Sequence, residues 1–151
     1  AFNKWDAAED KQKLIKETQW RLEDSLAQLK DIPLIPISAL REKRLDELMD
    51  KLLELYRTWN KRVPTGEMNR WMETMTQAHP PPLVSGRPNR MKYITQIKSR
   101  PPTFAMWASR PDALPDSYKR YIVNGLRQRF EIPGVPIRLL MRKSDNPYSN
   151  K

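Results

Sequence analysis

Glycine and proline are distributed unevenly along the chain, and this limits what each part can fold into. No glycine occurs before Gly66, and 12 of the 14 prolines and all four glycines follow Arg62. Because both residues interrupt regular elements, this change of composition indicates a break near Arg62. Val63-Pro64-Thr65-Gly66 has the composition of a linker. We therefore expect two domains, residues 1–62 and residues 63–151.

The excess of positive charge lies in the second segment. The whole chain has 28 Lys and Arg against 18 Asp and Glu, a formal net charge of +10. Segment 1–62 has 13 basic and 12 acidic residues, a net of +1, whereas segment 63–151 has 15 and 6, a net of +9. We therefore expect any phosphate-bearing partner to bind the second segment.

The chain opens with Asn3-Lys4-Trp5-Asp6, which resembles the guanine-reading loop of GTPases. A carboxylate offers two coplanar oxygens to the ring and exocyclic N–H donors of guanine, and such charge-assisted pairs are strong. The resemblance gives this role to Asp6, assigns Asn3 to steadying the loop, and places the aliphatic stem of Lys4 over one face of the base. The alternative is that Asp6 caps a helix that begins at Ala7, and both roles can hold together.

A second loop of the same kind follows a short apolar run. Residues 32–37 are predicted as a strand, and Ser38-Ala39-Leu40 follow at its carboxyl end, where ligands bind in open α/β sheets. In GTPases the small residue at this position lets a backbone N–H approach the guanine carbonyl, so Ala39 is the expected contact. The predicted guanine-binding residues are Asn3, Lys4, Asp6, Ser38, Ala39 and Leu40.

Two amphipathic helices accompany these loops. The first is predicted over residues 7–30 and the second over Leu45–Trp59, each with an apolar stripe at helical spacing. The order of loop, helix, strand, loop and helix is that of the last third of a doubly wound nucleotide-binding domain. This segment cannot close a sheet by itself.

Residues 1–62 lack the elements that hold phosphate. A phosphate loop needs Gly-x4-Gly-Lys-Ser/Thr so that backbone N–H groups can surround the phosphates, but the first glycine is Gly66. The Asp-x-x-Gly segment and the threonine that hold metal and water in this kind of phosphoryl transfer are also missing. We assign no catalytic residue and no metal ligand, expect no bound GTP and no hydrolysis by this piece alone, and interpret it as a fragment of a longer GTPase.

The second segment has the pattern of a small α+β domain. A helix is predicted over Thr65–Ala78 with Thr65 as its N-cap, and strands are predicted over Met91–Ser99 and Thr103–Ser109. The short turn between the strands favours antiparallel pairing. A helix over 115–130 and a strand over 135–142 complete the order helix, strand, strand, helix, strand.

Several motifs in this order resemble the carboxyl-terminal KH-like domain of the bacterial double-GTPase family called Der or EngA. They are Asn69-Arg70-Trp71, His79-Pro80-Pro81-Pro82, Lys92-Tyr93-Ile94-Thr95-Gln96, Pro101-Pro102-Thr103-Phe104, Ser117-Tyr118-Lys119-Arg120-Tyr121 and Gly134-Val135-Pro136-Ile137-Arg138-Leu139. The resemblance covers essentially the whole chain. It implies an α/β fold, in which the end of a P-loop-type GTPase domain is followed by an α+β KH-like domain.

The resemblance also implies a function. It predicts a cytoplasmic GTPase that acts in assembly of the large ribosomal subunit, with GTP or GDP and Mg²⁺ bound by the full-length parent. The expected partners are ribosomal RNA and the upstream GTPase domains of the same protein, and neither a membrane nor DNA is expected.

The charge pattern suggests which residues contact RNA. No acidic residue lies between Glu73 and Asp112, so this interval should attract phosphate in a salt-sensitive manner. The candidates are Arg87, Arg90, Lys92, Lys98, Arg100, Lys119 and Arg120. KH domains clamp nucleic acid with a Gly-x-x-Gly loop, which the glycine positions here cannot form. Two alternatives therefore remain, a solvated basic face and a module that docks on the GTPase domains without binding RNA.

Three further kinds of chemistry find no support in the sequence. There is no cysteine and a single histidine, which argues against disulfides and zinc sites. Aromatic residues could stack on bases, but Tyr93, Phe104, Tyr118 and Tyr121 are predicted to fill the core, and only Trp107 is left open. No apolar stretch has the length of a membrane span.

Overall fold

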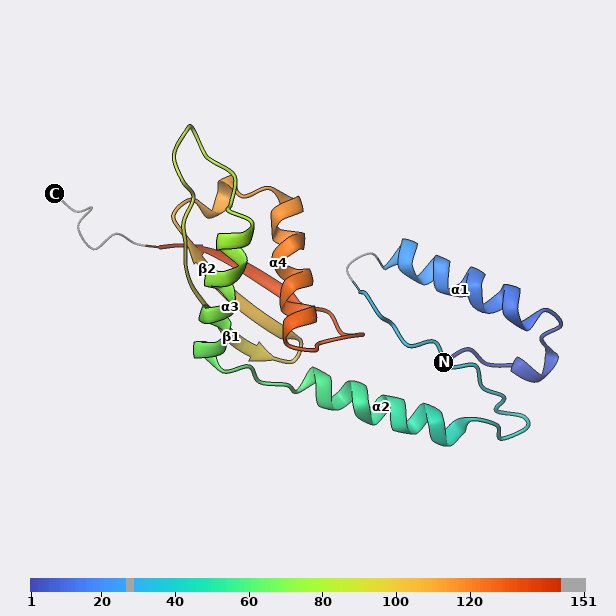
Figure 1. The fold of residues 1–151 in the computed structure, drawn as a ribbon. Helices are drawn as coiled ribbons and strands as arrows, with labels where there is room; N and C mark the ends of the chain where they lie inside the picture. The colour runs from blue at the N-terminus through green and yellow to red at the C-terminus, as the bar shows by residue number, and fades with distance from the viewer. Residues whose placement is uncertain (27–28, 145–151) are drawn as a thin grey trace. The chain divides into compact units, whose positions relative to one another are not determined.

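The computed structural model describes residues 1–26 and 29–144 and divides them into two compact units (Figure 1). The first unit contains residues 1–59 together with 133–136, and the second contains residues 60–132 and the chain from Ile137 onward. Each unit is considered by itself below.

Two helices form most of the first unit, α1 (Lys11–Ser25) and α2 (Leu45–Trp59), preceded by a short 3-10 helix, η1 (Trp5–Ala7). The bounds of α2 agree with the prediction. Helix α1 is shorter than the predicted 7–30, because the Asp10 side chain accepts a hydrogen bond from the Lys13 N–H and caps the helix there. Residues 27 and 28 lie outside the described residues. Asp6 lies inside η1 and does not cap α1.

The strand predicted over 32–37 is reduced to a single parallel bridge between Phe2 and Pro36. The Phe2 N–H donates to the Ile35 carbonyl at 2.8 Å, and the Ile37 N–H donates to the Phe2 carbonyl at 2.8 Å. These two bonds lie on either side of Pro36, so its missing N–H costs no hydrogen bond here. The pairing holds the chain start beside the segment that precedes Ser38.

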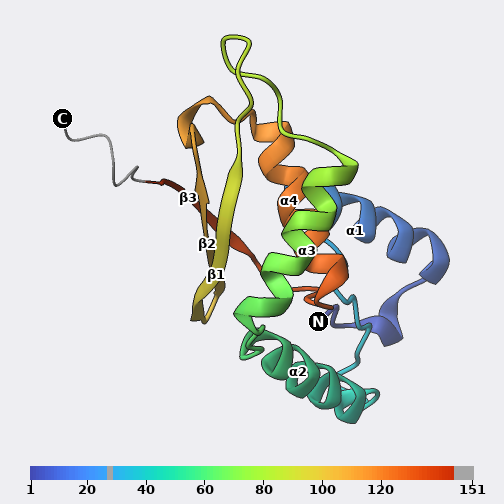
Figure 2. The ribbon, with the colours of Figure 1, turned by 60° about the vertical axis from the view of Figure 1, so that its left-hand side comes forward.

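The second unit is a three-stranded sheet with two helices on one face (Figures 1 and 2). Its elements are α3 (Thr65–Ala78), β1 (Met91–Ser99), β2 (Pro102–Ala108), η2 (Pro111–Ala113), α4 (Asp116–Arg129) and β3 (Arg138–Lys143). The sheet order is β1-β2-β3, with β1 antiparallel and β3 parallel to β2. The predicted element order and the antiparallel pairing are confirmed.

Three details of the second unit differ from the prediction. Thr65 is the first residue of α3 and not its cap; Pro64 occupies the N-cap position, and the Thr65 hydroxyl lies 3.1 Å from that of Thr95. Strand β3 begins at Arg138 and not at 135, since Pro136 has no N–H to donate to a ladder. Strand β2 is displaced one residue toward the N-terminus from its predicted bounds.

The core of the second unit lies between the helices and the sheet. Fully buried residues include Met68 of α3, Ile94 of β1, Phe104 and Met106 of β2, and Ile122 of α4. Gly125 lets the two helices approach: a Cβ built on it would lie 2.7 Å from Cζ2 of Trp71.

Side-chain amides complete the hydrogen bonding of this unit. The Asn69 amide donates to the Ile94 carbonyl and its oxygen accepts the Ile94 N–H, both at 3.0 Å, so α3 covers the edge of β1. Buried Gln96 accepts the Val63 N–H at 2.8 Å and donates to the Lys61 carbonyl at 2.9 Å. The chain that enters α3 is thereby fixed to the sheet.

Candidate functional site

The parallel pairing of Phe2 with Pro36 brings the two predicted guanine-binding loops together. Oδ1 of Asn3 accepts the Ala39 N–H at 3.1 Å and the Lys4 N–H at 2.8 Å. The Ser38 hydroxyl donates to Oδ1 of Asp6 at 2.5 Å and accepts the Arg41 N–H at 3.2 Å. Residues more than thirty positions apart in the sequence therefore form one hydrogen-bonded cluster, in which Asn3 steadies both loops.

The backbone of the first loop is held in an uncommon conformation. Lys4 has φ of 63°, in the left-handed region that non-glycine residues seldom adopt. Its N–H bond to Asn3 accompanies this turn, and the following residues enter η1. The turn leaves Lys4 and Asp6 exposed, as side chains must be if they are to contact a ligand.

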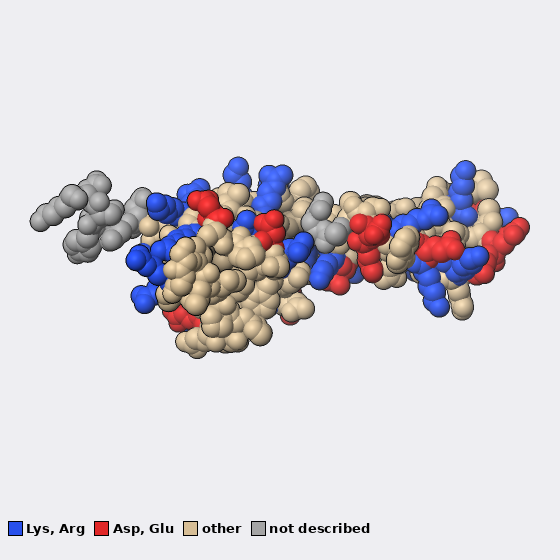
Figure 3. All heavy atoms as spheres, turned by 90° about the horizontal axis from the view of Figure 1, so that it is seen from above, with Lys and Arg blue, Asp and Glu red and all other residues tan. Residues whose placement is uncertain are grey.

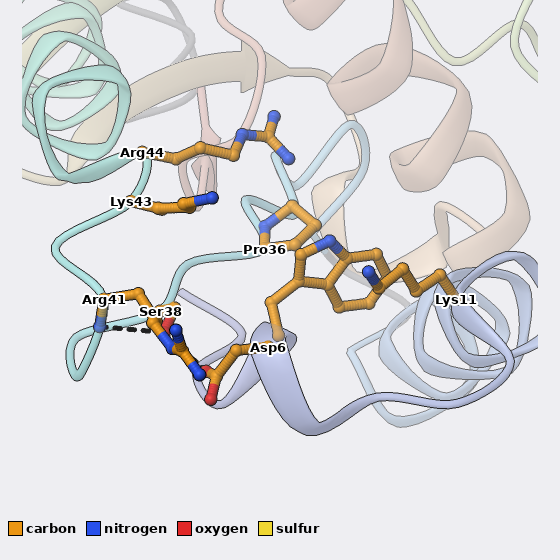
Figure 4. Close-up of a pocket in the computed structure, with 8 residues that line it drawn as sticks. Asp6, Lys11, Pro36, Ser38, Arg41, Lys43 and Arg44 are labelled. Carbon is orange, nitrogen blue, oxygen red and sulfur yellow. Dashed lines mark hydrogen bonds between the residues drawn. The ribbon is translucent and has the colours of Figure 1, made fainter.

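Asp6 is held in its ionised form. The hydrogen bond from Ser38 is the main cause that lowers the pKa of the Asp6 carboxyl below its ordinary value, with smaller contributions from its own backbone N–H, Arg41 and Lys11. Figure 4 shows the Arg41 guanidinium pointing toward this carboxylate. A carboxylate oxygen has two lone pairs, so Oδ1 can accept a further donor while it keeps Ser38.

The remaining loop residues are placed less directly for a ligand. The Ala39 N–H already donates to Asn3, so a guanine carbonyl would have to share or displace that bond. Leu40 is 83 % exposed and lies at the tip of its loop.

A pocket of about 330 Å³ adjoins the cluster (Figure 4). Its lining includes Asp6 and Ser38 but none of Asn3, Lys4, Ala39 and Leu40. Four of the eight lining residues are cations, namely Lys11, Arg41, Lys43 and Arg44. None of these four cations was among the predicted binding residues, because only the folded loops place them around one cavity.

The predicted RNA-binding residues do not form one patch. Arg87 and Arg90 lie in the 79–90 segment, at the end of the unit where the Tyr118 hydroxyl of α4 donates to the His79 carbonyl at 2.7 Å. Lys98 lies at the opposite end of β1, and eight residues of extended strand separate it from Arg90 by roughly 25 Å.

The other four candidates divide between these two ends. Arg100 follows β1 directly, at the same end as Lys98, and Lys92 lies near the start of that strand. Lys119 and Arg120 lie in the first turn and a half of α4, near the 79–90 segment, and Lys119 forms an ion pair with Asp116 at 2.9 Å. We call Arg87, Arg90 and Arg120 the loop-end cations below.

Two aromatic expectations were wrong or incomplete. Tyr93, expected in the core, is 43 % exposed, because β1 places it on the face of the sheet away from the helices. Phe104 and Tyr118 are buried as expected, and burial raises the pKa of Tyr118 to about 12. Trp107, which the sequence left open, packs against Tyr93 with ring centroids 5.5 Å apart.

The structure was also searched for metal-binding groups and for membrane-spanning helices. Among residues 1–26 and 29–144, no three His, Cys, Asp or Glu side chains group in a way that could hold a metal ion. Over the same residues, no helix has both the length and the apolar character needed to cross a bilayer.

Comparison with known proteins places both units in one family. Residues 62–142 match the family model described as the KH-domain-like, C-terminal part of EngA bacterial GTPase enzymes. The chain is 48 % identical over 151 residues to the GTPase Der of Mesorhizobium japonicum, 48 % over 149 residues to that of Parvibaculum lavamentivorans, and 47 % over 151 residues to that of Agrobacterium fabrum. These alignments cover 99 to 100 % of this chain and 32 % of each relative.

The chain thus spans about a third of the length of the curated relatives it matches. Its guanine-loop motifs and its second unit both fall inside these alignments. The chain belongs to the Der (EngA) family of bacterial GTPases.

Proposed function

We propose that this chain supplies the guanine-reading loops and a KH-like RNA-contacting domain to a GTPase that acts in assembly of the large ribosomal subunit. The observation that carries the first part is the joined loop cluster, in which Asn3 ties the two loops together and Ser38 donates to the exposed Asp6 carboxylate. In this proposal GTP or GDP and Mg²⁺ bind the full-length protein, whose other segments hold the phosphates and the metal.

Nucleotide specificity tests the role of Asp6. In the full-length protein, Asp6→Asn replaces a carboxylate that accepts two N–H groups with an amide that accepts one and donates one. The amide opposes the exocyclic amine of guanine but complements the carbonyl at the same position of xanthine. We expect GTP affinity to fall by at least a hundredfold and XTP affinity to rise, since hydrogen-bonding sites discriminate strongly. The measurement is nucleotide titration by calorimetry.

Glu9→Gln is the matched control, because Glu9 is an exposed carboxylate three residues from Asp6. It should leave both affinities unchanged. Unaltered GTP binding by Asp6→Asn would show that this loop does not read guanine.

The basic second unit supports the RNA part of the proposal. The net charge of +9 on segment 63–151, the acid-free interval from 74 to 111 and the family relationship all favour a contact with ribosomal RNA. The loop-end cations lie where the 79–90 segment approaches the start of α4. Each is exposed, so its charge can be reversed without disturbing the core.

Charge reversal tests this contact. The combined variant Arg87→Glu, Arg90→Glu and Arg120→Glu should weaken binding of the full-length protein to large ribosomal subunits roughly tenfold or more, because several phosphate contacts are lost. Co-sedimentation at fixed salt measures the effect. The control reverses three exposed cations of α1, Lys13, Lys16 and Arg21, and changes net charge equally. Equal weakening by both variants would contradict a specific contact.

A second function for the KH-like domain is docking on the GTPase domains. The absence of a Gly-x-x-Gly loop favours it, because the usual backbone clamp cannot form. Under this alternative, removal of residues 63–151 changes GTP affinity or turnover, and the loop-end variant binds ribosomal subunits normally. Unchanged nucleotide kinetics together with lost subunit binding favours the RNA contact.

A further inference from the structure

The sheet of the second unit has one face packed on helices and one face without them. Figure 2 shows the sheet nearly edge-on, with α3 and α4 both on the same side. Ile94, Phe104 and Met106 point to that side and are fully buried. No helix of this unit, as far as the structure describes it, lies on the opposite side. We call that side the open sheet face; the residues on it that matter below are Tyr93, Lys98, Trp107, Arg138 and Arg142.

A row of three planar side chains crosses the open sheet face. The register pairs Tyr93 with Trp107 and Trp107 with Arg142, so one residue of each strand contributes. The Tyr93 and Trp107 ring centroids are 5.5 Å apart, and Cζ of Arg142 lies 5.4 Å from the Trp107 ring centroid. Trp107 therefore supports a tyrosine ring on one side and a guanidinium plane on the other.

The outer members of this row remain accessible. Tyr93 is 43 % exposed and Arg142 is exposed, whereas Trp107 is partly covered by its two neighbours. A tyrosine that served only to fill the core would be buried, as Phe104 on the same sheet is. Aromatic rings and guanidinium planes are the two side-chain surfaces on which unpaired bases stack.

The charge of the sheet is entirely positive. No Asp or Glu occurs on β1, β2 or β3, whereas five cations do, at Lys92, Lys98, Arg138, Arg142 and Lys143. None of the three cations of the open sheet face forms an ion pair with another residue that the structure describes. An acidic protein surface would neutralise these cations but would leave the planar row unused, whereas a neutral surface would leave the cations unpaired, so the combination favours a polyanion that carries flat groups.

We infer that the open sheet face binds an unpaired RNA strand. Tyr93 and Arg142 stack on bases, Lys98 and Arg138 contact phosphates, and Trp107 is a positioning residue that holds the two stacking groups. This inference rests on the proposed RNA contact and adds the kind of RNA and the surface that receives it. Because every base has a flat face, the binding has little sequence preference.

Binding of short RNAs to the 151-residue chain tests the inference. The probes are a labelled oligouridine of about eight nucleotides and a blunt RNA duplex of about 16 base pairs, compared by fluorescence anisotropy at one salt concentration. We expect tighter binding of the oligouridine. Tyr93→Thr should weaken it about tenfold, while Tyr93→Phe, which keeps the ring, should bind within about twofold of the unchanged chain.

Arg142→Gln provides a second variant that does not depend on the tyrosine. Its matched control is Arg21→Gln on α1, which removes the same charge from an exposed position in the other unit. Arg142→Gln should weaken oligouridine binding more than duplex binding, and Arg21→Gln should affect the two RNAs alike. Thermal unfolding of each variant confirms that the fold is retained.

The outcomes separate this inference from the proposed function. If the loop-end charge reversals abolish subunit binding while Tyr93→Thr and Arg142→Gln bind oligouridine normally, the open sheet face is not the RNA surface, although the RNA contact stands. Equal affinity for duplex and oligouridine also overturns the inference. If the Tyr93 and Arg142 variants lose only binding to the GTPase domains, the face is a protein interface and the inference is wrong.

Discussion

Among single residues, Ser38 has the most direct measurable effect, because its hydroxyl controls the ionisation of Asp6. The hydrogen bond from Ser38 is the largest cause of the lowered pKa of that carboxyl. A lowered carboxyl pKa stabilises the fold at pH values above the unfolded pKa, and this stabilisation is lost as the pH falls through the folded pKa. Because the ordinary carboxyl pKa already lies well below 7, Asp6 is ionised at neutral pH in any case, and the bond from Ser38 extends its ionised range to lower pH.

Replacement of Ser38 by alanine tests the effect of its hydroxyl on the pKa of Asp6. Ser38→Ala removes the donor, so the pKa of Asp6 should rise toward its ordinary value, and acid should destabilise the variant less steeply in that pH range. A pH titration of the Asp6 carboxyl by NMR measures the midpoint. Ser99→Ala, in the other unit, is the control and should leave the midpoint in place, whereas an unchanged midpoint in Ser38→Ala would contradict the assignment.

At the scale of elements, Gly125 sets how closely α3 and α4 pack. Sequence patterning placed a glycine on the apolar face of α4 but could not say which element it meets. The structure gives Trp71 as that neighbour, whose ring also lies edge-on to Phe130 with centroids 5.8 Å apart. The indole is therefore held from two sides and has little freedom to move away from an added methyl group.

A pair of glycine substitutions isolates this contact. Gly125→Ala gains roughly 1 kcal/mol of helix propensity but overpacks against the indole at a cost of about 1–3 kcal/mol, so we expect net destabilisation on the order of 1 kcal/mol. Gly66→Ala in α3 meets only Nη1 of Arg70 at 3.8 Å and should be neutral or stabilising. Urea unfolding measures both. Equal stability of the two variants would show that the interhelical gap accommodates a methyl group.

Helix α2 shows a second limit at the scale of elements. Its apolar stripe was predicted to face a core, yet three members of that stripe, Met49, Leu52 and Tyr56, are each at least half exposed. The period of the stripe fixes the helix and its apolar side correctly. The sequence of the helix does not show which surface covers that side, because the partner surface is formed by other residues.

For the whole molecule, the acid-free interval did not become a single basic patch. Residues 87–100 are close in sequence, but β1 is extended and carries its two ends roughly 25 Å apart. The cations of this interval therefore fall into a group near the 79–90 segment and a group near the β1–β2 turn. Arg138 of β3, distant in the sequence, instead lies level with Lys98 across the sheet, because both pair with Thr103 of β2.

The sequence by itself determined the presence of the helices, the element order of the second unit, two motifs that resemble guanine-reading loops, and the family, because turn residues, hydrophobic period and short motifs are local properties of the chain. The tertiary structure alone decided which residues meet. Pairing of Phe2 with Pro36 joined Asn3 to Ala39 and Asp6 to Ser38. Sheet register brought Tyr93, Trp107 and Arg142 into one row. These contacts depend on which strands pair with each other and on the two bulges in β1. No single segment of the sequence encodes either feature.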